Sequence, residues 1–251
     1  MGAVIAVANQ KGGVAKTTTV HALASALSAL GRKVLLVDFD PQACLTFSTG
    51  VDSDQLEISV HDVMLGRIKA DEAILDLGGF HLLPSTIDLA GTEIHLLTKT
   101  GREFVLQRAL KPIVGSFDYS LIDCGPSLGI LTINALTAAT HVLIPFQAET
   151  LSQRAIRQLR ETIDDVHHYT NDGLTTLGAV ATMVDGRTRL SHLILDEVAT
   201  MHGLQLLPPP IPRSVRAAEA PGRGRSVVDH APSSNPAVAY RQLAATIDER
   251  L

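Results

Sequence analysis

Short apolar runs alternate with longer amphipathic segments along most of the chain. A continuous apolar run is typical of a strand that is covered on both faces, as in a parallel sheet. The pattern predicts strands at 4–8, 33–38, 80–85, 119–124, 141–146, 177–184 and 204–212. It predicts helices at 17–30, 102–111, 129–139, 151–170, 190–202 and 236–250. This alternation indicates an α/β fold, with a doubly wound, mostly parallel sheet and helices on both faces.

The chain shows no internal repeat, low-complexity tract or long linker that would divide its 251 residues. We therefore expect residues 1–251 to form a single domain, a size that buries most of its apolar surface. The region 50–75 has no clear pattern and receives no element.

The segment between the first strand and the first helix, Asn9–Thr19 (NQKGGVAKTTT), is a candidate phosphate-binding loop. The general pattern is glycine, any four residues, glycine, lysine and then Ser or Thr. Lys16 and Thr17 match its end, whereas Gln10 and Ala15 occupy the two glycine positions. The loop therefore departs from the general pattern but keeps its context between a strand and a helix.

The chemistry of this loop still favours a nucleotide. Glycines 12 and 13 allow a tight turn that brings backbone N–H groups close to phosphate oxygens, and the following helix adds its positive dipole end. We expect Lys16 to hold the β- and γ-phosphates and Thr17 to ligate Mg²⁺. Ala15 fits only if its φ angle is negative. The predicted ATP-binding residues of the loop are Lys11, Gly12, Gly13, Val14, Ala15, Lys16, Thr17 and Thr18.

Carboxylates follow two of the predicted strands. Asp38 and Asp40 stand at the end of the strand 33–38, and Asp123 lies in the apolar segment YSLIDCGPS that starts at Tyr119. The carboxyl ends of parallel strands meet at one edge of a sheet, where α/β proteins bind ligands. We expect Asp123 to hold Mg²⁺ through water. The alternative is that these aspartates only cap loops.

Four segments carry a family resemblance. KGGVAKTTT resembles the deviant Walker A loop, KGGxxKT, of the ParA/MinD group of P-loop ATPases, which needs neither missing glycine but usually has Gly where Ala15 stands. LLVDFDPQ, YSLIDCGPS and IPRSVRAAEAP are similar to further family segments. The resemblance covers nearly the whole chain and follows the small Soj-like ParA proteins. It implies an ATP hydrolase that uses ATP and Mg²⁺ and dimerises with ATP.

The resemblance also implies individual roles. Lys11, which has no evident use within its own subunit, would reach the nucleotide of a second subunit, and Asp40 would orient the attacking water. The implied catalytic residues are Lys11, Lys16 and Asp40. The implied metal site contains Thr17, Asp38, Asp40 and Asp123. The backbone near Pro212 and Arg213 would hold adenine, although Ser214 replaces the asparagine that is usual in the family.

Arginines gather late in an otherwise acidic chain of formal net charge −5. Such a cluster is a candidate surface for the phosphates of double-stranded DNA, and without a helix-turn-helix we expect the binding to ignore sequence. The resemblance implies DNA contacts for Arg187 and Arg216, and the clustering adds Arg223 and Arg225. The alternative is a solvated surface or a set of salt bridges between subunits.

Composition excludes several classes of protein. The chain is 45% hydrophobic and 19% charged, as ordinary globular proteins are, and no apolar run approaches the roughly 20 residues that span a bilayer. Its two cysteines form no CxxC pair, and no HExxH motif is present. We therefore expect a cytoplasmic protein without a transition metal or membrane partner.

The leading hypothesis is a nucleoid-associated ParA-type ATPase that partitions a chromosome or plasmid and is stimulated by a ParB-like centromere-binding protein. Three alternatives remain open. A MinD-like membrane ATPase would need a basic amphipathic last helix, but AVAYRQLAATIDERL is mixed in charge. A ParA-like ATPase could instead position another cargo or regulate. A nitrogenase-reductase-like protein would need paired cluster-binding cysteines, and Cys124 has no suitable second.

Overall fold

The computed structural model of this chain describes residues 2–149, 152–185, 198 and 204–251. One sheet of seven strands runs through the described part, in the order β3-β4-β2-β5-β1-β6-β7. The strands are β1 (Ala3–Val7), β2 (Val34–Phe39), β3 (Leu75–Asp76), β4 (His81–Leu83), β5 (Tyr119–Cys124), β6 (His141–Gln147) and β7 (Thr175–Thr182). Only the short edge pair β3–β4 is antiparallel. The predicted α/β class with a mostly parallel sheet is confirmed.

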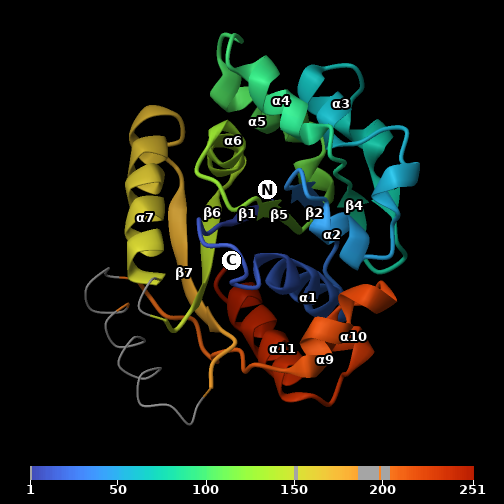
Figure 1. Cartoon of the computed structure of the whole chain (residues 1–251), viewed down its shortest axis with the longest axis vertical. Helices are drawn as coiled ribbons and strands as arrows, with labels where there is room; N and C mark the ends of the chain where they lie inside the picture. Colours follow the sequence, from blue (N-terminus) through green and yellow to red (C-terminus); the bar gives the residue numbers. More distant parts are fainter. Residues whose placement is uncertain (1, 150–151, 186–197, 199–203) are drawn as a thin grey trace.

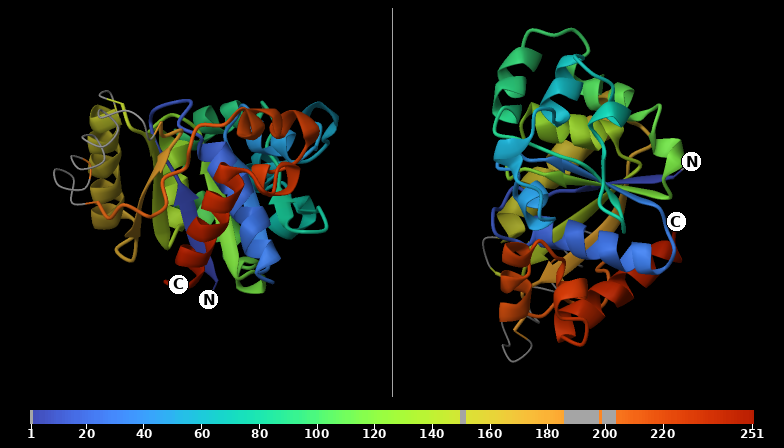
Figure 2. Two further views of the ribbon diagram at one scale, coloured as in Figure 1. Left: turned by 90° about the horizontal axis from the view of Figure 1, so that it is seen from below. Right: turned by 90° about the vertical axis from the view of Figure 1, so that its right-hand side faces the viewer.

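Helices cover both faces of this sheet (Figures 1 and 2). One face packs against α1 (Lys16–Ala29), α10 (Val227–His230) and α11 (Asn235–Asp248), and the other against α3 (Val60–Leu65), α5 (Val105–Leu110), α6 (Ile130–Ala138) and α7 (Ser152–Tyr169). The remaining short helices are α2 (Cys44–Ser48), α4 (Leu89–Leu96) and α9 (Val215–Glu219). Single 3₁₀ turns lie at Ser53–Gln55, Ala70–Ala73, Arg102–Phe104, Val114–Ser116 and Pro221–Arg223.

The apolar runs identify the central strands because both of their faces are covered. All six residues of β2 and all six of β5 are buried. In α1 the apolar residues Val20, Leu23, Ala24 and Leu27 are also buried, whereas Leu30, the C-cap, is half exposed. Gly31 follows with a φ of 81°, as a glycine that ends a helix does.

One prediction meets a different result. The segment 204–212 forms no strand; it makes only isolated bridges, from Ala179 to Leu206 and from Val184 to Pro212. Its three consecutive prolines, 208–210, have no N–H groups to donate to a ladder, which explains the error. The predicted helix at 190–202 lies outside the described residues except for Val198. The region 50–75, which had no prediction, contains α3 and two 3₁₀ turns.

Strand register brings the candidate site together. β5 lies between β1 and β2, so that Val7, Asp38 and Asp123 stand side by side near the carboxyl ends of the three strands. The loop after β1, the loop after β2 and the end of β5 therefore meet at one edge of the sheet.

Candidate nucleotide site

The loop after β1 turns through two left-handed residues before α1 begins. Gly13 has a φ of 75°, and Ala15, the N-cap of α1, has a φ of 63° and a ψ of 33°. Our expectation that Ala15 has a negative φ is therefore wrong. A left-handed conformation at a residue with a Cβ is unfavourable by roughly 1–2 kcal/mol, whereas glycine adopts it readily. The loop holds local strain at the position where the family usually has glycine.

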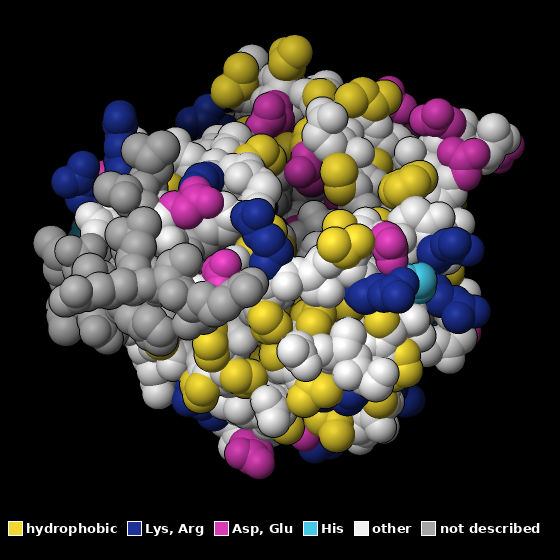
Figure 3. All heavy atoms as spheres, turned by 60° about the horizontal axis from the view of Figure 1, so that its bottom comes forward, with side chains coloured by type: hydrophobic (Ala, Val, Ile, Leu, Met, Phe, Trp, Pro, Cys, Tyr) yellow, Lys and Arg dark blue, Asp and Glu magenta, His cyan; other side chains and the backbone are white. Residues whose placement is uncertain are grey.

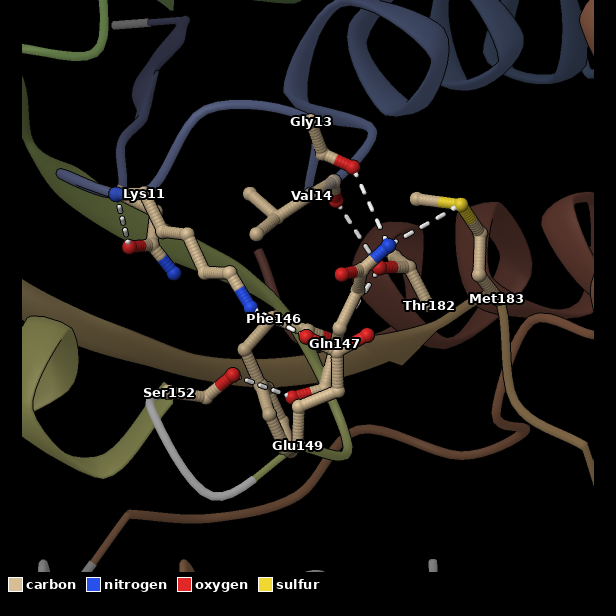
Figure 4. Close-up of polar contacts among 10 residues, drawn as sticks. Lys11, Gly13, Val14, Phe146, Gln147, Glu149, Ser152, Thr182 and Met183 are labelled. Carbon is tan, nitrogen blue, oxygen red and sulfur yellow. Dashed lines mark hydrogen bonds and ion pairs between the residues drawn. The ribbon is translucent and has the colours of Figure 1, made fainter.

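Side chains from β6 and β7 hold this loop in place (Figure 4). Gln147 donates from Nε2 to the carbonyl of Gly13 at 3.3 Å, and the Thr182 hydroxyl donates to the carbonyl of Val14 at 2.9 Å. On the other side, Asn9 donates from Nδ2 to the Pro145 carbonyl at 2.7 Å. The first two bonds hold carbonyls of the loop, and the third ties the Asn9 side chain to β6, so β6 and β7 fix the loop in place.

Lys16 and Thr17 open α1 and face the end of β5. Lys16 is 7% exposed, and its Nζ lies 3.4 Å from the Lys11 carbonyl oxygen. Burial lowers the pKa of Lys16, while the charge of Asp123 opposes that shift. The Thr17 hydroxyl donates to Oδ2 of Asp123 at 2.7 Å. A cation and a hydroxyl thus stand beside one buried carboxylate, as the sequence predicts.

Asp123 has capacity left for a cation. It is 1% exposed, and its Oδ1 is buried without a hydrogen-bond partner. Burial, and then the neighbouring Asp38, raise the pKa of Asp123 well above its usual value. A buried carboxylate oxygen without a partner is rare and calls for a ligand. Because Mg²⁺ prefers carboxylate, hydroxyl and water oxygens, Thr17 and Asp123 fit this ion.

Asp38 has a different setting. It is fully buried; its Oδ2 accepts bonds from both the backbone N–H and the hydroxyl of Thr46, each at 2.7 Å, and its Oδ1 accepts the N–H of Asp40 at 3.3 Å. Burial raises the pKa of Asp38 to about 6. Among the described residues, no three His, Cys, Asp or Glu side chains form a metal-binding group. Metal ligation by Asp38 and Asp40 therefore stays a prediction.

A cavity of about 780 Å³ opens beside the loop. Its walls come from the loop, α1, the segment after β2 and the segment 211–227. The predicted site residues among its lining are Gly12, Gly13, Ala15, Lys16, Thr17, Thr18, Asp40, Pro212, Arg213 and Arg225. Ser214 also lines it, but the Ser214 oxygen accepts the N–H of Arg216 as the N-cap of α9. Its hydroxyl is thus engaged by the protein.

Lys11 has a partner within its own chain, contrary to the expectation that it has none. Its Nζ forms an ion pair with Oε2 of Glu149 at 2.5 Å, and its N–H donates to the Asn9 side chain at 3.0 Å (Figure 4). The Lys11 side chain is 24% exposed and that of Glu149 is 53% exposed. The sequence analysis did not identify Glu149, because 138 residues separate it from Lys11.

The predicted DNA-contacting arginines have different settings. Arg216 on α9 pairs with Glu219, Nη1 to Oε2, at 3.2 Å, and His230 lies 3.9 Å from the same oxygen. Arg223 and Arg225 are exposed, and Arg225 also lines the cavity. Lys and Arg side chains gather beside a histidine at the right of the face in Figure 3. Arg187 lies outside the described residues.

Comparisons with known proteins agree with this geometry. A model of the AAA domain family matches residues 2–176. The chain is 39% identical to the sporulation initiation inhibitor protein Soj of Bacillus subtilis, over 98% of each chain. It is also 39% identical to the chromosome partitioning protein ParA of Caulobacter vibrioides, over 98% of this chain and 94% of the relative. The chain belongs to the ParA/Soj family of partition ATPases.

A solved structure supports the same ATPase fold. It is described as cobyrinic acid a,c-diamide synthase from Mycobacterium smegmatis with bound ADP and magnesium. It is 47% identical and superposes with a TM-score of 0.90, covering all of this chain and 95% of the other. The predicted family, fold class and ATPase activity are confirmed. No helix of the described residues is long and apolar enough to cross a membrane.

The strain at Ala15 yields a prediction about stability. We expect Ala15→Gly to raise the free energy of unfolding by about 1 kcal/mol, because glycine removes the left-handed penalty. Ala43, with a φ of 49°, should respond in the same direction. Ala245→Gly in α11 is the matched control and should lower stability by about 1 kcal/mol. Urea unfolding measures all three; a loss of stability in Ala15→Gly would contradict the strain.

A buried histidine yields a prediction about pH. His21 on α1 is 4% exposed, and burial lowers its pKa to about 4. Between about pH 6.5 and 4, only the unfolded chain binds a proton at His21, so stability falls as pH falls. The loss should reach about 3 kcal/mol at most. His21→Gln should show a shallower decline than wild type when unfolding is measured from pH 7 to 4.5. Parallel declines would contradict the assignment.

Proposed function

We propose that this chain acts as a single ATPase domain that dimerises on ATP, binds double-stranded DNA without sequence preference and releases it when a ParB-like partner stimulates hydrolysis. It would work in the cytoplasm on the nucleoid, partitioning a chromosome or plasmid. The observation that carries the proposal is the pair of lysines at one loop. Lys16 is buried and lines the cavity, whereas the side chain of Lys11, in the same loop, is 24% exposed and paired with Glu149.

Nucleotide and metal have suitable partners on this chain. Lys16 would hold the β- and γ-phosphates, and Thr17 with Asp123 would hold Mg²⁺. Bound Mg²⁺ neutralises charge on the phosphate oxygens during phosphoryl transfer. The backbone at Pro212 and Arg213, in the far wall of the cavity, would hold adenine. The magnesium and ADP in the Mycobacterium smegmatis structure support this assignment.

Hydrolysis would depend on Asp40 and Lys11. Asp40 lines the cavity at the end of β2, where its carboxylate would orient the attacking water. Lys11 of the second subunit would place a positive charge on the phosphates as negative charge develops, as an arginine finger does. Because Lys11 is paired with Glu149 in the single chain, its cross-subunit role requires an exchange of partners.

The membrane alternative gains no support from the packing of α11. To bind a bilayer, this helix would need an apolar face that is free to enter it. In α11 the large apolar residues Tyr240, Leu243 and Ile247 are buried in the core that includes α1. A ParA-like ATPase that positions another cargo shares every feature of the site, so it remains the second candidate for the biological role.

Two other chemistries lack support at the cysteines. Nucleophilic catalysis by a cysteine would need an activated thiolate, and a shared iron–sulfur cluster would need paired thiolates. Cys124 is buried and Cys44 is exposed, and loss of hydration raises the thiol pKa of each. Neither chemistry therefore gains support from the two thiols.

The first prediction from this proposal concerns dimerisation. With ATP, an Asp40→Ala protein should form dimers, because it binds nucleotide but hydrolyses it slowly. Adding Lys11→Ala should keep it monomeric. Adding Glu149→Gln should strengthen the dimer by up to about fivefold for each of the two pairs that are exchanged, since an exposed pair is worth about 0–1 kcal/mol. Light scattering at several protein concentrations is the measurement. Lys16→Ala serves as the control without nucleotide. Normal dimers of the Lys11→Ala variant would remove the cross-subunit role.

The second prediction concerns DNA. Arg216→Ala should weaken binding of the ATP dimer to any duplex and reduce its salt dependence, because phosphate contacts release counterions. Glu219→Gln should act in the opposite direction, since Glu219 competes with phosphate for Arg216. Arg67→Ala, which removes an exposed arginine that is likewise paired with a carboxylate, that of Asp62, is the matched control.

The assay is a gel-shift titration of two unrelated duplexes, with ATP and with ADP, at several salt concentrations. Equal effects of Arg216→Ala and Arg67→Ala would show that Arg216 contributes only net charge. If the ATP dimer does not bind DNA at low salt but sediments with anionic liposomes, the MinD-like alternative replaces the partition proposal.

A further inference from the structure

A buried polar network lies directly behind Asp40. Its first member, Asp38, bonds the Asp40 N–H through Oδ1 and Thr46 through Oδ2. Its last member, Ser85, follows β4 and donates its hydroxyl to the Asp40 carbonyl at 2.9 Å. Both polar groups of the Asp40 backbone are therefore held by side chains of the protein interior.

Thr46 joins the two halves of this network. The Ser85 N–H donates to the Thr46 hydroxyl oxygen at 2.9 Å, so the single hydroxyl proton of Thr46 is free to point at Asp38, 2.7 Å away. Asp38, Thr46 and Ser85 are each 0% exposed. The chain of donors and acceptors runs in one direction only, from Ser85 through Thr46 to Asp38. Fully satisfied buried networks of this kind are rigid.

The network adds to one local backbone restraint, because the Asp40 carbonyl also accepts the N–H of Ala43 at 2.9 Å. Asp40 is partly exposed at the cavity, and its side chain accepts only the N–H of Gln42, from Oδ1 at 3.0 Å. A group that orients water must be held within about 0.5 Å of its working position, because an error of about 1 Å can lower a rate about 100-fold. The backbone of Asp40 therefore needs the fixation that the network provides.

We propose that Thr46 and Ser85 are positioning residues for ATP hydrolysis, which act through Asp40 without touching nucleotide or water. This inference rests on the proposed role of Asp40 in orienting the attacking water. It predicts that loss of either hydroxyl lowers turnover and leaves ATP affinity nearly unchanged, because Lys16 and the glycine loop bind the phosphates independently of the network.

The central comparison is Thr46→Val against Thr46→Ser. Valine keeps the shape and removes the hydroxyl, whereas serine keeps the hydroxyl. We expect Thr46→Val to lower single-turnover ATP hydrolysis by about 10- to 100-fold with ATP affinity changed less than about twofold, and Thr46→Ser to retain most activity. Ser85→Ala removes the bond to the Asp40 carbonyl and a longer one, of 3.4 Å, to the Thr86 carbonyl. It should give a smaller fall in the same direction, because the Ala43 N–H still holds the Asp40 carbonyl.

A structural control separates positioning from general loosening of the fold. Thr137 on α6 is also 0% exposed, and its hydroxyl bonds that of Thr170 at 2.9 Å, outside the network. Thr137→Val should lower the melting temperature as Thr46→Val does but leave turnover unchanged. Equal turnover of Thr46→Val, Ser85→Ala and wild type would overturn the proposal, as would equal losses in Thr137→Val and Thr46→Val.

Double variants distinguish the positioning role of Thr46 from the proposed role of Asp40 in orienting water. If Thr46 acts through Asp40, adding Thr46→Val to Asp40→Ala causes no further loss of turnover. A full additional loss in the double variant would overturn the positioning role alone. Wild-type turnover in Asp40→Ala would overturn the role of Asp40 and, with it, the inference. If Thr46→Val does not fold, Ser85→Ala alone carries the same comparison.

Discussion

The parallel pairing of β5 with both β1 and β2 is the constraint on which the rest of the site depends. It aligns Val7, Asp38 and Asp123 in one row near the carboxyl edge of the sheet. A register slip of one residue would turn Asp123 to the opposite face and separate it from Thr17, because successive side chains in a strand point to opposite sides. The fully buried apolar residues of these strands fix that register, so ordinary core packing sets the geometry of the polar site.

That geometry concentrates unfavourable features in a small volume. Asp38 and Asp123 are neighbours on paired strands, and desolvation raises the pKa of both. Lys16 is buried against them, and Ala15 and Ala43 adopt left-handed conformations at the starts of α1 and α2. These unfavourable features persist because the packed core around them holds the backbone in a single conformation. A site that holds charge and strain in this way is suited to a ligand that brings four negative charges and a divalent cation.

The sequence was sufficient for the central strands, the long helices and the phosphate loop, because each has a strong local signal. It was insufficient where the signal was not local. The short helices α3 and α9 each begin at a serine N-cap, Ser59 and Ser214, and show no long periodic pattern. Because of the prolines at 208–210, the apolar segment 204–212 forms two isolated β-bridges instead of a strand. Thr46, Ser85 and Glu149 belong to the site only through the fold, and serine, threonine and glutamate are too common for any motif to single them out.

If Lys11 has the proposed role across the subunit interface, its pair with Glu149 would make the association of two chains depend on nucleotide. An exposed ion pair contributes only about 0–1 kcal/mol, so it neutralises Lys11 without holding it firmly. A polyphosphate buried between two subunits offers more negative charge in a medium of lower dielectric constant, where attraction is stronger. The exchange is then favourable with a γ-phosphate in place and much less so without it. A weak internal partner thus serves the proposed switch better than none, because it keeps a free cation from attracting other anions between cycles.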